Sequence, residues 1–532
     1  MKLVSKTILS LLGLVMTASC TKLDEGDLLY DQVVQDEFFQ SNRELISAVG
    51  AAYTNLYGFR GGLTNVNEVT SDEIVVPTRG ADWGDGGHWV RLKLHTYKPN
   101  DSEINGSWNM LYAGVNTCNR LLATLEPVGT PQSLAFIAEL KVLRAIYYYW
   151  LLDTFGNVPL STDFKDIVPP ANSTRKQVYD FVEKEIKDNM GVLPKTGPND
   201  QSTYGRVNYY TAQAALAKLY LNAEVYTGTA QWDKCVAACD EIINSGKYSL
   251  TINYKDNFVR DNTGASEFIW AIPFDQVHAK GFQLNHQTLH QESQKTYNMT
   301  AQPWNGFATV SEFYNSYIDP TQNPGPQGTV VGLDPKGTPI TGTTDKRLSN
   351  FLVGPQFDAA GVRLLDGASD PEDPDGQPLT FTPDMNQLEP RAWRQTGARI
   401  NKWEFYNGMT SDLSNDVAIF RYADFLLAKA EAIARKNNNW NDATALTLVN
   451  QIRTQHGGVT PFVTMTDATF LAERGREMFF ESFRRQDMIR FDKYNKAFTF
   501  HPADADKHVN ILPIPEAQIN ANQNLKQNPG YQ

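Results

Sequence analysis

Apolar side chains recur every three to four positions in several long stretches of the chain, which is the pattern of amphipathic helices. The clearest stretch runs from Phe136 to Leu151, and the helix-ending residues Gly156 and Pro159 follow it. Similar stretches run from Trp108 to Leu122 and from Val178 to Met190. This spacing predicts long helices in the first half of the chain.

Two further stretches begin with residues that cap helices. Ser41 to Glu44 form a capping box, SNRE, ahead of apolar residues at helical spacing. Asn208 precedes an alanine-rich stretch from Ala212 to Ala223, whose small side chains permit close helix packing. A short turn then leads to Cys235–Ile243, which Gly246 closes. These last two stretches predict a helix pair a little longer than one tetratricopeptide repeat.

Helical spacing returns near the C-terminus. It covers Tyr422 to Arg435, Asn441 to His456 and Thr466 to Arg490. Successive helices that are joined by short turns pack as antiparallel pairs. The pattern therefore predicts a mostly α fold, a tetratricopeptide-like helical-repeat scaffold over about residues 41–246 and 418–495.

Two parts of the chain lack this periodicity. Residues from about 250 to 415 are rich in Gly, Pro, Asn, Asp and Thr, and a long irregular region of this kind is more often a functional insertion than a spacer. A shorter loop from Val76 to Asn100 carries two Trp among several Gly. Exposed Trp side chains there would indicate a binding surface, and the alternative is that both fill the helical body.

The composition is that of a folded, acidic protein. Of the 532 residues, 41% are hydrophobic and 20% are charged, and the formal net charge is −12. Nucleic acid is not expected as a partner, because its binding needs a basic surface. The 10 Trp, 23 Tyr and 27 Phe can fill a core or line a surface for flat, partly apolar ligands.

The first twenty residues indicate export. Lys2 and Lys6 precede a short apolar run from Ile8 to Met16, which predicts a signal peptide over residues 1–19. Cys20, at the cleavage point, resembles the lipobox cysteine of bacterial lipoproteins, which becomes acylated. We expect Cys20 to be a lipid anchor to the outer membrane. The alternative is an ordinary signal peptide with an incidental Cys.

The remaining cysteines are not expected to form disulfides. Their number is odd, and Cys235 and Cys239 lie four apart on one helical stretch, where disulfide geometry is poor. Together with Cys118 they are expected to be small core residues.

No metal site or cofactor is expected from the sequence. His286 and His290 lie four apart but lack the Glu of a zinc-protease motif, so we expect a surface pair. Asp370–Gly376, DPEDPDG, is similar to a calcium loop, but Pro374 stands where a ligand is needed. We interpret it as a solvated acidic turn with at most an incidental calcium ion.

The sequence carries no motif of catalysis. It has neither a Gly-x-Ser-x-Gly elbow nor a phosphate loop. Its 60 Asp and Glu residues make a glycosidase carboxylate pair possible in principle, but nothing singles out such a pair. We therefore expect a protein that is not an enzyme, and a surface glycoside hydrolase or a pure interaction scaffold are the alternatives.

Five stretches in order along the chain resemble the SusD/RagB family of Bacteroidetes outer-membrane lipoproteins. They are AELKVLRAIYYYWLLDTFGNVPL (138–160), GRVNYYTAQAALAKLYL (205–221), FRYADFLLAKAEA (420–432), ERGREMFFESFRRQDMIR (473–490) and ILPIPEAQINANQNLKQNPGYQ (511–532). Phe155 and Asn157 stand where the family usually has Tyr and Asp, and Ser482 and Arg485 where it has Gly and Trp.

This resemblance implies a single domain over residues 20–532, with four tetratricopeptide-like helix pairs and a variable, loop-rich region packed on them. Family members are non-enzymatic, surface-exposed lipoproteins. They sit as a lid over a SusC-like TonB-dependent transporter and deliver an oligosaccharide to it. The RagB branch binds peptides instead, so a peptide ligand remains the alternative.

The resemblance places the sugar site by region, in the early loop and the middle insertion. A glycan offers apolar ring faces and a rim of hydroxyls, so aromatic faces beside planar polar groups suit it. We expect Trp83 and Trp304 to stack on sugar rings, and Arg79 and Asn305 to hydrogen-bond hydroxyls. The further candidates from these regions are Asp72, Trp89 and Tyr297, with Trp393 and Arg399 in RAWRQTGAR.

Overall fold

A computed structural model describes residues 41–318, 330–333, 339–341, 345–367 and 377–531. The predicted signal peptide, Cys20 and the acidic stretch Asp370–Gly376 lie outside these residues. The described residues from Val49 onward cluster into one compact unit.

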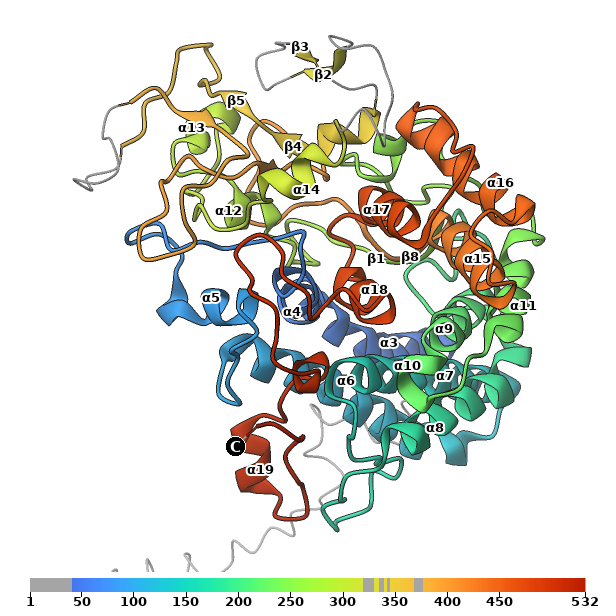
Figure 1. The fold of residues 1–532 in the computed structure, drawn as a ribbon. Coiled ribbons are helices and arrows are strands. Elements are labelled where there is room, and N and C mark those ends of the chain that lie inside the picture. Colours follow the sequence, from blue (N-terminus) through green and yellow to red (C-terminus); the bar gives the residue numbers. More distant parts are fainter. Residues whose placement is uncertain (1–40, 319–329, 334–338, 342–344, 368–376, 532) are drawn as a thin grey trace, which may run out of the picture. The chain divides into compact units, whose positions relative to one another are not determined.

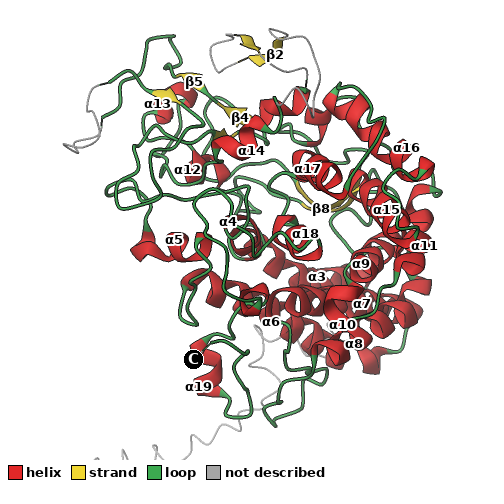
Figure 2. Ribbon diagram, viewed as in Figure 1, coloured by secondary structure: helices red, strands yellow, loops and turns green. Residues whose placement is uncertain are grey.

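The fold is mostly α, as the periodicity predicts (Figures 1 and 2). The helices are α3 (Asn42–Tyr53), α4 (Leu63–Val69), α5 (His88–Lys93), α6 (Ser102–Leu125), α7 (Pro131–Phe155), α8 (Arg175–Asn189), α9 (Tyr209–Leu221), α10 (Ala223–Thr227), α11 (Trp232–Ile243), α12 (Leu284–Thr288), α13 (Ser293–Tyr297), α14 (Ser311–Asn315), α15 (Tyr422–Lys436), α16 (Ala443–Ile452), α17 (Asp467–Met478), α18 (Arg484–Arg490) and α19 (Glu516–Ala521).

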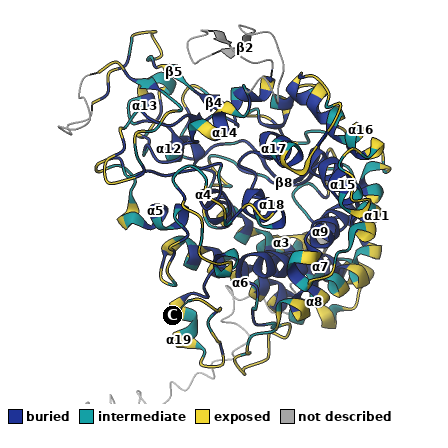
Figure 3. Cartoon of the chain, in the orientation of Figure 1, coloured by how far each residue is buried: buried dark blue, intermediate teal, exposed yellow. Residues whose placement is uncertain are grey.

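Consecutive long helices pack against each other as a repeat scaffold requires. α7 packs against both α6 and α8, α9 against α11, and α15 against α16. α11 also packs against α15, which joins the two helical parts of the chain across the insertion between them. All residues of α9 are buried, whereas α8 keeps an exposed face (Figure 3). None of the described helices is both long and apolar enough to cross a membrane.

The helix ends follow the capping signals of the sequence. The Ser41 backbone N–H donates to the Glu44 carboxylate at 2.9 Å, and Glu44 N–H donates back to Ser41 Oγ at 3.3 Å. Asn208 Oδ1 accepts a hydrogen bond from Thr211 N–H at 2.9 Å and caps α9. Gly156, with φ of +70°, ends α7. These predictions are confirmed.

The prediction of a single helix from Thr466 to Arg490 is wrong, because this stretch forms two helices. α17 ends at Met478, α18 begins at Arg484, and Phe480 and Ser482 between them have left-handed φ values of +57° and +72°. The resemblance to the SusD/RagB family leads us to expect Gly at position 482, and Gly is the residue best suited to this backbone. Two buried carboxylates hold the turn, since Glu73 accepts from Phe480 N–H at 3.0 Å and Glu68 accepts from Ser482 N–H.

The middle region contains short elements rather than a sheet. Strand β1 (Phe268–Ile272) pairs antiparallel with β8 (Val417–Arg421), and both strands are buried. The remaining strands form three two-stranded antiparallel pairs: β2 (Val330–Leu333) with β3 (Pro339–Thr341), β4 (Phe351–Leu352) with β7 (Arg399–Ile400), and β5 (Gly354–Pro355) with β6 (Thr380–Phe381). Loops dominate this part of the chain (Figure 2).

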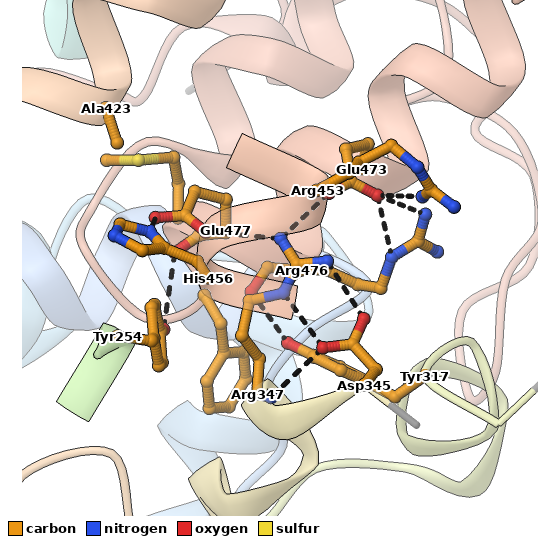
Figure 4. Close-up of polar contacts among 12 residues, drawn as sticks. Tyr254, Tyr317, Asp345, Arg347, Ala423, Arg453, His456, Glu473, Arg476 and Glu477 are labelled. Atoms are coloured by element: carbon orange, nitrogen blue, oxygen red, sulfur yellow. Dashed lines mark hydrogen bonds and ion pairs between the residues drawn. The ribbon is translucent and has the colours of Figure 1, made fainter. Parts of the chain in front are cut away.

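A buried network of charged side chains joins the insertion to the C-terminal helices (Figure 4). His456 Nδ1 lies 2.8 Å from Glu477 and its Nε2 lies 3.2 Å from Glu267. Arg421 pairs with the same two carboxylates at 2.7 and 2.9 Å. Arg347 reaches Glu477 at 3.1 Å from the insertion side. Each of these charges has a partner of opposite sign, which buried ions require.

Two smaller predictions have different outcomes. Cys118, Cys235 and Cys239 are free and buried, which confirms them as core residues. His286 and His290 are not a surface pair, because they are 2% and 1% exposed. The loops of the insertion fold over both histidines, and such long-range packing leaves no mark in a local pattern.

Candidate functional site at a junction of three loops

Three segments that are far apart in the sequence meet beside α5. Val75 and Ala308 exchange both backbone hydrogen bonds, at 2.9 and 3.0 Å. Thr309 N–H donates to the Ala398 carbonyl at 2.9 Å, which adds the segment before β7. The early tryptophan loop and the two aromatic stretches of the insertion therefore lie side by side, as the regional placement of the site requires.

Arg79 connects these loops from the inside. Its guanidinium donates to the backbone carbonyls of Asn305 at 2.6 Å and Gly306 at 2.7 Å. It also donates to the Thr396 carbonyl at 2.6 Å. The side chain is only 1% exposed, so it supports the loops rather than facing solvent.

Asp82 is the centre of a second set of polar contacts between the loops. Its carboxylate accepts hydrogen bonds from Gln291 at 2.6 Å, Asn305 at 3.0 Å and Arg394 at 3.1 Å. The Asn305 side-chain oxygen accepts from Arg399 at 2.8 Å. Asn305 is 1% exposed and Arg399 is fully buried. The expected contacts of Arg79 and Asn305 with ligand hydroxyls thus do not match their placement, since both position loops.

An aromatic cluster lies on this polar framework. The Trp83 ring centroid lies 4.8 Å from that of Trp89, 5.4 Å from that of Trp304 and 5.3 Å from that of Phe307. These tilted and edge-on contacts are the favoured arrangements of aromatic rings. Gly306 makes room for the Trp83 ring, because a Cβ at that position would lie 2.0 Å from Trp83 Cε3.

The members of the cluster differ in exposure. Trp83 and Trp304 are half-buried. Trp89 is 1% exposed, and its indole N–H donates to Asp85 at 3.1 Å. Of the three tryptophans in this cluster, Trp83 and Trp304 are half-buried and Trp89 is buried.

Asp72 and Tyr297 make their contacts elsewhere. The Asp72 carboxylate pairs with the Arg484 guanidinium at 2.6 and 2.7 Å. Burial alone would raise the pKa of Asp72, but the Arg484 charge outweighs it and lowers the pKa. The Tyr297 ring packs edge-on against Phe405 at 5.9 Å. Neither contact involves the tryptophan pair.

An open cavity of about 820 Å³ borders the same junction. Trp393, at its wall, is 42% exposed, although it is a large apolar residue. Thr396, which also lines the cavity, is the residue whose carbonyl binds Arg79. The lining residues are Gln377, Pro378, Thr380, Thr382, Asp384, Met385, Asn386, Trp393, Gln395 and Thr396.

This lining combines one flat aromatic face with hydroxyl and amide groups. Such a mixture can hold an uncharged, hydroxyl-rich ligand by stacking and by hydrogen bonds. Sequence reasoning had Trp393 as a further candidate but missed its neighbours. The sequence does contain a signal for these cavity residues, because Asn386, Trp393 and Gln395 lie close together in a stretch rich in Thr and Pro.

The histidines near the junction carry no charge at neutral pH. Burial lowers the pKa of His286, whose ring lies 5.5 Å from that of Trp304. Burial also lowers the pKa of His290, although Asp366 lies 3.2 Å away and opposes the shift. The neutral form that burial favours for these two imidazoles does not attract an anionic ligand.

Two family models match the chain. The SusD family model matches residues 266–531, and a model described as "Starch-binding associating with outer membrane" matches residues 39–221. The starch-binding protein SusD of Bacteroides thetaiotaomicron is 25% identical over 508 residues, which cover 89% of this chain and 86% of that protein.

Solved structures share the fold. A SusD superfamily protein from Parabacteroides distasonis superposes with a TM-score of 0.71 at 19% identity, and the match covers 94% of this chain and 100% of that one. Surface glycan-binding protein A from Bacteroides thetaiotaomicron, in complex with laminarihexaose, has a TM-score of 0.69 at 21% identity, over 92% and 99% of the two chains. With the SusD model spanning half of its length, the chain belongs to the SusD family.

Proposed function

We propose that this protein is a surface glycan-binding lipoprotein that captures an oligosaccharide without catalysis and delivers it to a SusC-like TonB-dependent transporter. The observation that carries the proposal is the half-exposed Trp83–Trp304 pair beside the open cavity with its exposed Trp393. Aromatic faces next to hydroxyl and amide groups match the two chemical sides of a sugar ring.

The related proteins support this ligand class. Their names describe starch binding and laminarihexaose binding, and both ligands are neutral glucose polymers. The wall of the cavity has one carboxylate, Asp384, and no basic side chain among its lining residues. A neutral glycan suits such a wall better than a strongly charged ligand, which needs opposite charge.

The proposal includes a tether and a partner. Acylated Cys20 would hold the protein at the outer membrane, and the transporter would hold the captured glycan close to its channel. Stacking on a few aromatic rings gives weak binding, because immobilising a flexible sugar offsets much of the contact energy. A tether and a partner raise the effective concentration of the glycan and compensate for weak binding.

Co-purification with a TonB-dependent transporter, compared between wild type and Cys20→Ala, tests the proposed tether and partner.

Native affinity electrophoresis tests ligand binding directly. The purified protein would be run in gels that contain starch, laminarin, levan, mannan, xylan or pectin, with the same polysaccharides assayed afterwards for released sugars. We expect retardation by at least one glycan and no release of product. Release of sugars would identify a hydrolase, and heat from peptide mixtures without any retardation would identify a peptide-binding protein.

Trp393→Ala tests the site. The structure shows no hydrogen bond from the Trp393 indole within the described residues, so the substitution removes a stacking face with little effect on folding. We expect binding of the retarding glycan to weaken about tenfold, since one central aromatic contact contributes about 1 to 2 kcal/mol. Calorimetry with the matching oligosaccharide would measure it.

Trp232→Ala is the matched control, because Trp232 is a half-buried tryptophan on α11, outside the junction. Its glycan affinity should equal that of the wild type. Unchanged affinity in Trp393→Ala, Trp83→Ala and Trp304→Ala, each with a native circular dichroism spectrum, would show that the glycan binds elsewhere.

A further inference from the structure

Two histidines and one aspartate from opposite ends of the chain meet beneath the surface. His95 follows α5, whereas His501 and Asp504 lie between α18 and α19. His95 Nδ1 lies 2.9 Å and His501 Nε2 lies 3.6 Å from the same oxygen, Asp504 Oδ2. One ligand-type atom of each residue falls within 4.8 Å of the other two.

The other nitrogen of each imidazole faces a backbone carbonyl. His95 Nε2 lies 2.8 Å from the Thr70 oxygen, and His501 Nδ1 lies 3.1 Å from the Lys93 oxygen. A carbonyl oxygen can only accept a hydrogen bond, so both of these nitrogens carry the proton. In neutral rings the remaining nitrogens, His95 Nδ1 and His501 Nε2, therefore present lone pairs to Asp504.

Three electron-rich atoms, His95 Nδ1, His501 Nε2 and Asp504 Oδ2, therefore face one another in a buried part of the protein. Both imidazole side chains are fully buried and the Asp504 side chain is 10% exposed. Within the described residues, His501 Nε2 makes no hydrogen bond. A cation between the three atoms would remove the repulsion.

We propose that His95, His501 and Asp504 bind a divalent transition-metal ion, for which Zn²⁺ is the probe. Imidazole nitrogens with one carboxylate suit zinc and similar ions, whereas calcium and magnesium prefer oxygen ligands alone. Metal-bound histidines generally donate their other ring N–H to a carbonyl or a carboxylate, and both histidines here do so.

The surroundings hold the three side chains in place. The His95 ring stacks on Tyr494 at 4.2 Å, and the His501 ring stacks on Phe498 at 4.4 Å. Asn495 Nδ2 donates to Asp504 Oδ2 at 3.0 Å and orients the carboxylate. The ligand atoms of a tetrahedral zinc site lie about 3.4 Å apart. The separations of His95 Nδ1 and His501 Nε2 from Asp504 Oδ2, 2.9 and 3.6 Å, lie close to that spacing.

A metal ion at this site would link the segment that carries His501 and Asp504 to the loop after α5, which carries His95. It would connect residues that are about 400 positions apart in the sequence, and the partly exposed side of Asp504 leaves room for a water molecule as fourth ligand.

Zinc titration of the metal-stripped protein tests the proposal. Isothermal calorimetry and elemental analysis should give one Zn²⁺ per chain, and Co²⁺ in its place should show a visible absorption band of tetrahedral coordination. His501→Asn keeps a donor for the Lys93 carbonyl but removes Nε2, and His95→Gln keeps a donor for the Thr70 carbonyl but removes Nδ1. Each should weaken zinc binding at least tenfold.

His278→Gln is the control, because His278 is an exposed histidine outside the cluster. It should bind zinc like the wild type. Zinc should also raise the unfolding temperature of the wild type and not that of His501→Asn. The proposal is overturned if the wild type binds no zinc stoichiometrically, or if His501→Asn and His95→Gln, both folded by circular dichroism, keep the wild-type affinity.

Discussion

Trp83 and Gly306 show how single residues shape the proposed glycan site. The indole occupies the volume that a side chain at position 306 would need, so the absence of a Cβ sets the position of the ring. Gly306 directly follows Asn305, whose carbonyl binds Arg79. The position of the Trp83 ring therefore depends on Gly306, and that of the Trp304 loop on the contact between Asn305 and Arg79.

Gly306→Ala should disturb the site through this contact. The new Cβ would lie 2.0 Å from Trp83 Cε3 and 2.8 Å from the Gln287 carbonyl oxygen, so the ring must move. We expect a loss of about 1 to 3 kcal/mol in the free energy of unfolding, as for other overpacked positions, and weaker glycan binding. Urea unfolding and affinity electrophoresis would measure the two effects.

Gly84→Ala is the control in the same loop. Its Cβ would meet only the Asp82 carbonyl oxygen, at an ordinary 3.4 Å, and its φ of −96° is open to alanine. The free energy of unfolding and the glycan binding of Gly84→Ala should stay near those of the wild type. A Gly306→Ala protein as stable as Gly84→Ala would mean that the Trp83 ring is free to shift.

At the scale of single residues, the sequence indicates which loops form the proposed glycan site, but it does not indicate which of their side chains are exposed. Trp83 and Trp304 are half-buried, and their stacking on sugar rings stays a prediction. Arg79, Asn305 and Trp89 come from the same strings but are buried. Residue type indicates which contacts a side chain can make, whereas its exposure depends on segments more than 200 positions away, such as Thr396 for Arg79.

At the scale of elements, the helix pair α6 and α7 shows how closely the repeat scaffold packs. Gly114 of α6 faces the ring of Tyr147 on α7, and a Cβ on Gly114 would lie 2.3 Å from Tyr147 Cζ. Tyr147 is fully buried, and its hydroxyl donates to the Ala52 carbonyl at 3.0 Å. The ring therefore has little freedom to move away.

Gly114→Ala and Gly106→Ala, in the same helix, should change stability in opposite directions. Gly114→Ala is expected to lower the free energy of unfolding by about 1 to 3 kcal/mol through overpacking. Gly106 is exposed and a Cβ there meets nothing within 4 Å, so alanine should stabilise α6 by up to about 1 kcal/mol. Urea unfolding of the two variants side by side measures the difference, and equal stabilities would contradict the tight α6–α7 contact.

The sequence predicts where most helices lie and how they are capped, but it does not predict the interruption between α17 and α18. The caps at Ser41 and Asn208 and the glycine stop at Gly156 are local signals, because the groups they satisfy lie within a few residues. The interruption at Phe480–Ser482 follows instead from Glu68 and Glu73, about 400 residues earlier, which accept hydrogen bonds from that turn. Helical periodicity continues through the turn, so the pattern alone predicts one helix.

At the scale of the whole molecule, the buried charges of Figure 4 connect α17 with the insertion, and Arg421 of β8 also pairs with Glu477 of α17. His456 is the titratable member of interest. Burial alone would lower its pKa, but the adjacent carboxylates Glu477 and Glu267 outweigh it and raise the pKa to about 9. The imidazole therefore stays protonated in the folded protein well above the usual pKa of about 6.5.

His456 should make stability depend on pH on the alkaline side. A pKa that is higher in the folded than in the unfolded state gives stabilisation that is complete below about pH 6.5 and lost as pH rises through about 9. The shift corresponds to a contribution on the order of 3 kcal/mol. His456→Gln should therefore be less stable than the wild type at pH 6.5, and the difference should shrink by pH 9.

Urea unfolding from pH 6 to 10 measures this dependence, and His278→Gln serves as the exposed-histidine control. That control should follow the wild-type curve. Parallel curves for the wild type and His456→Gln would contradict a protonated His456 between the two carboxylates.

The sequence by itself determined the features that depend on neighbouring positions: the helices and their caps, the acidic surface charge, the family, and the two regions that supply the proposed site. Tertiary structure decided which tryptophans are exposed, where the last long helix breaks, and which charges are buried together. It also decided that His95 and His501 share one carboxylate. Helical periodicity is set within one or two turns, whereas burial and the meeting of side chains are set by contacts between segments hundreds of residues apart.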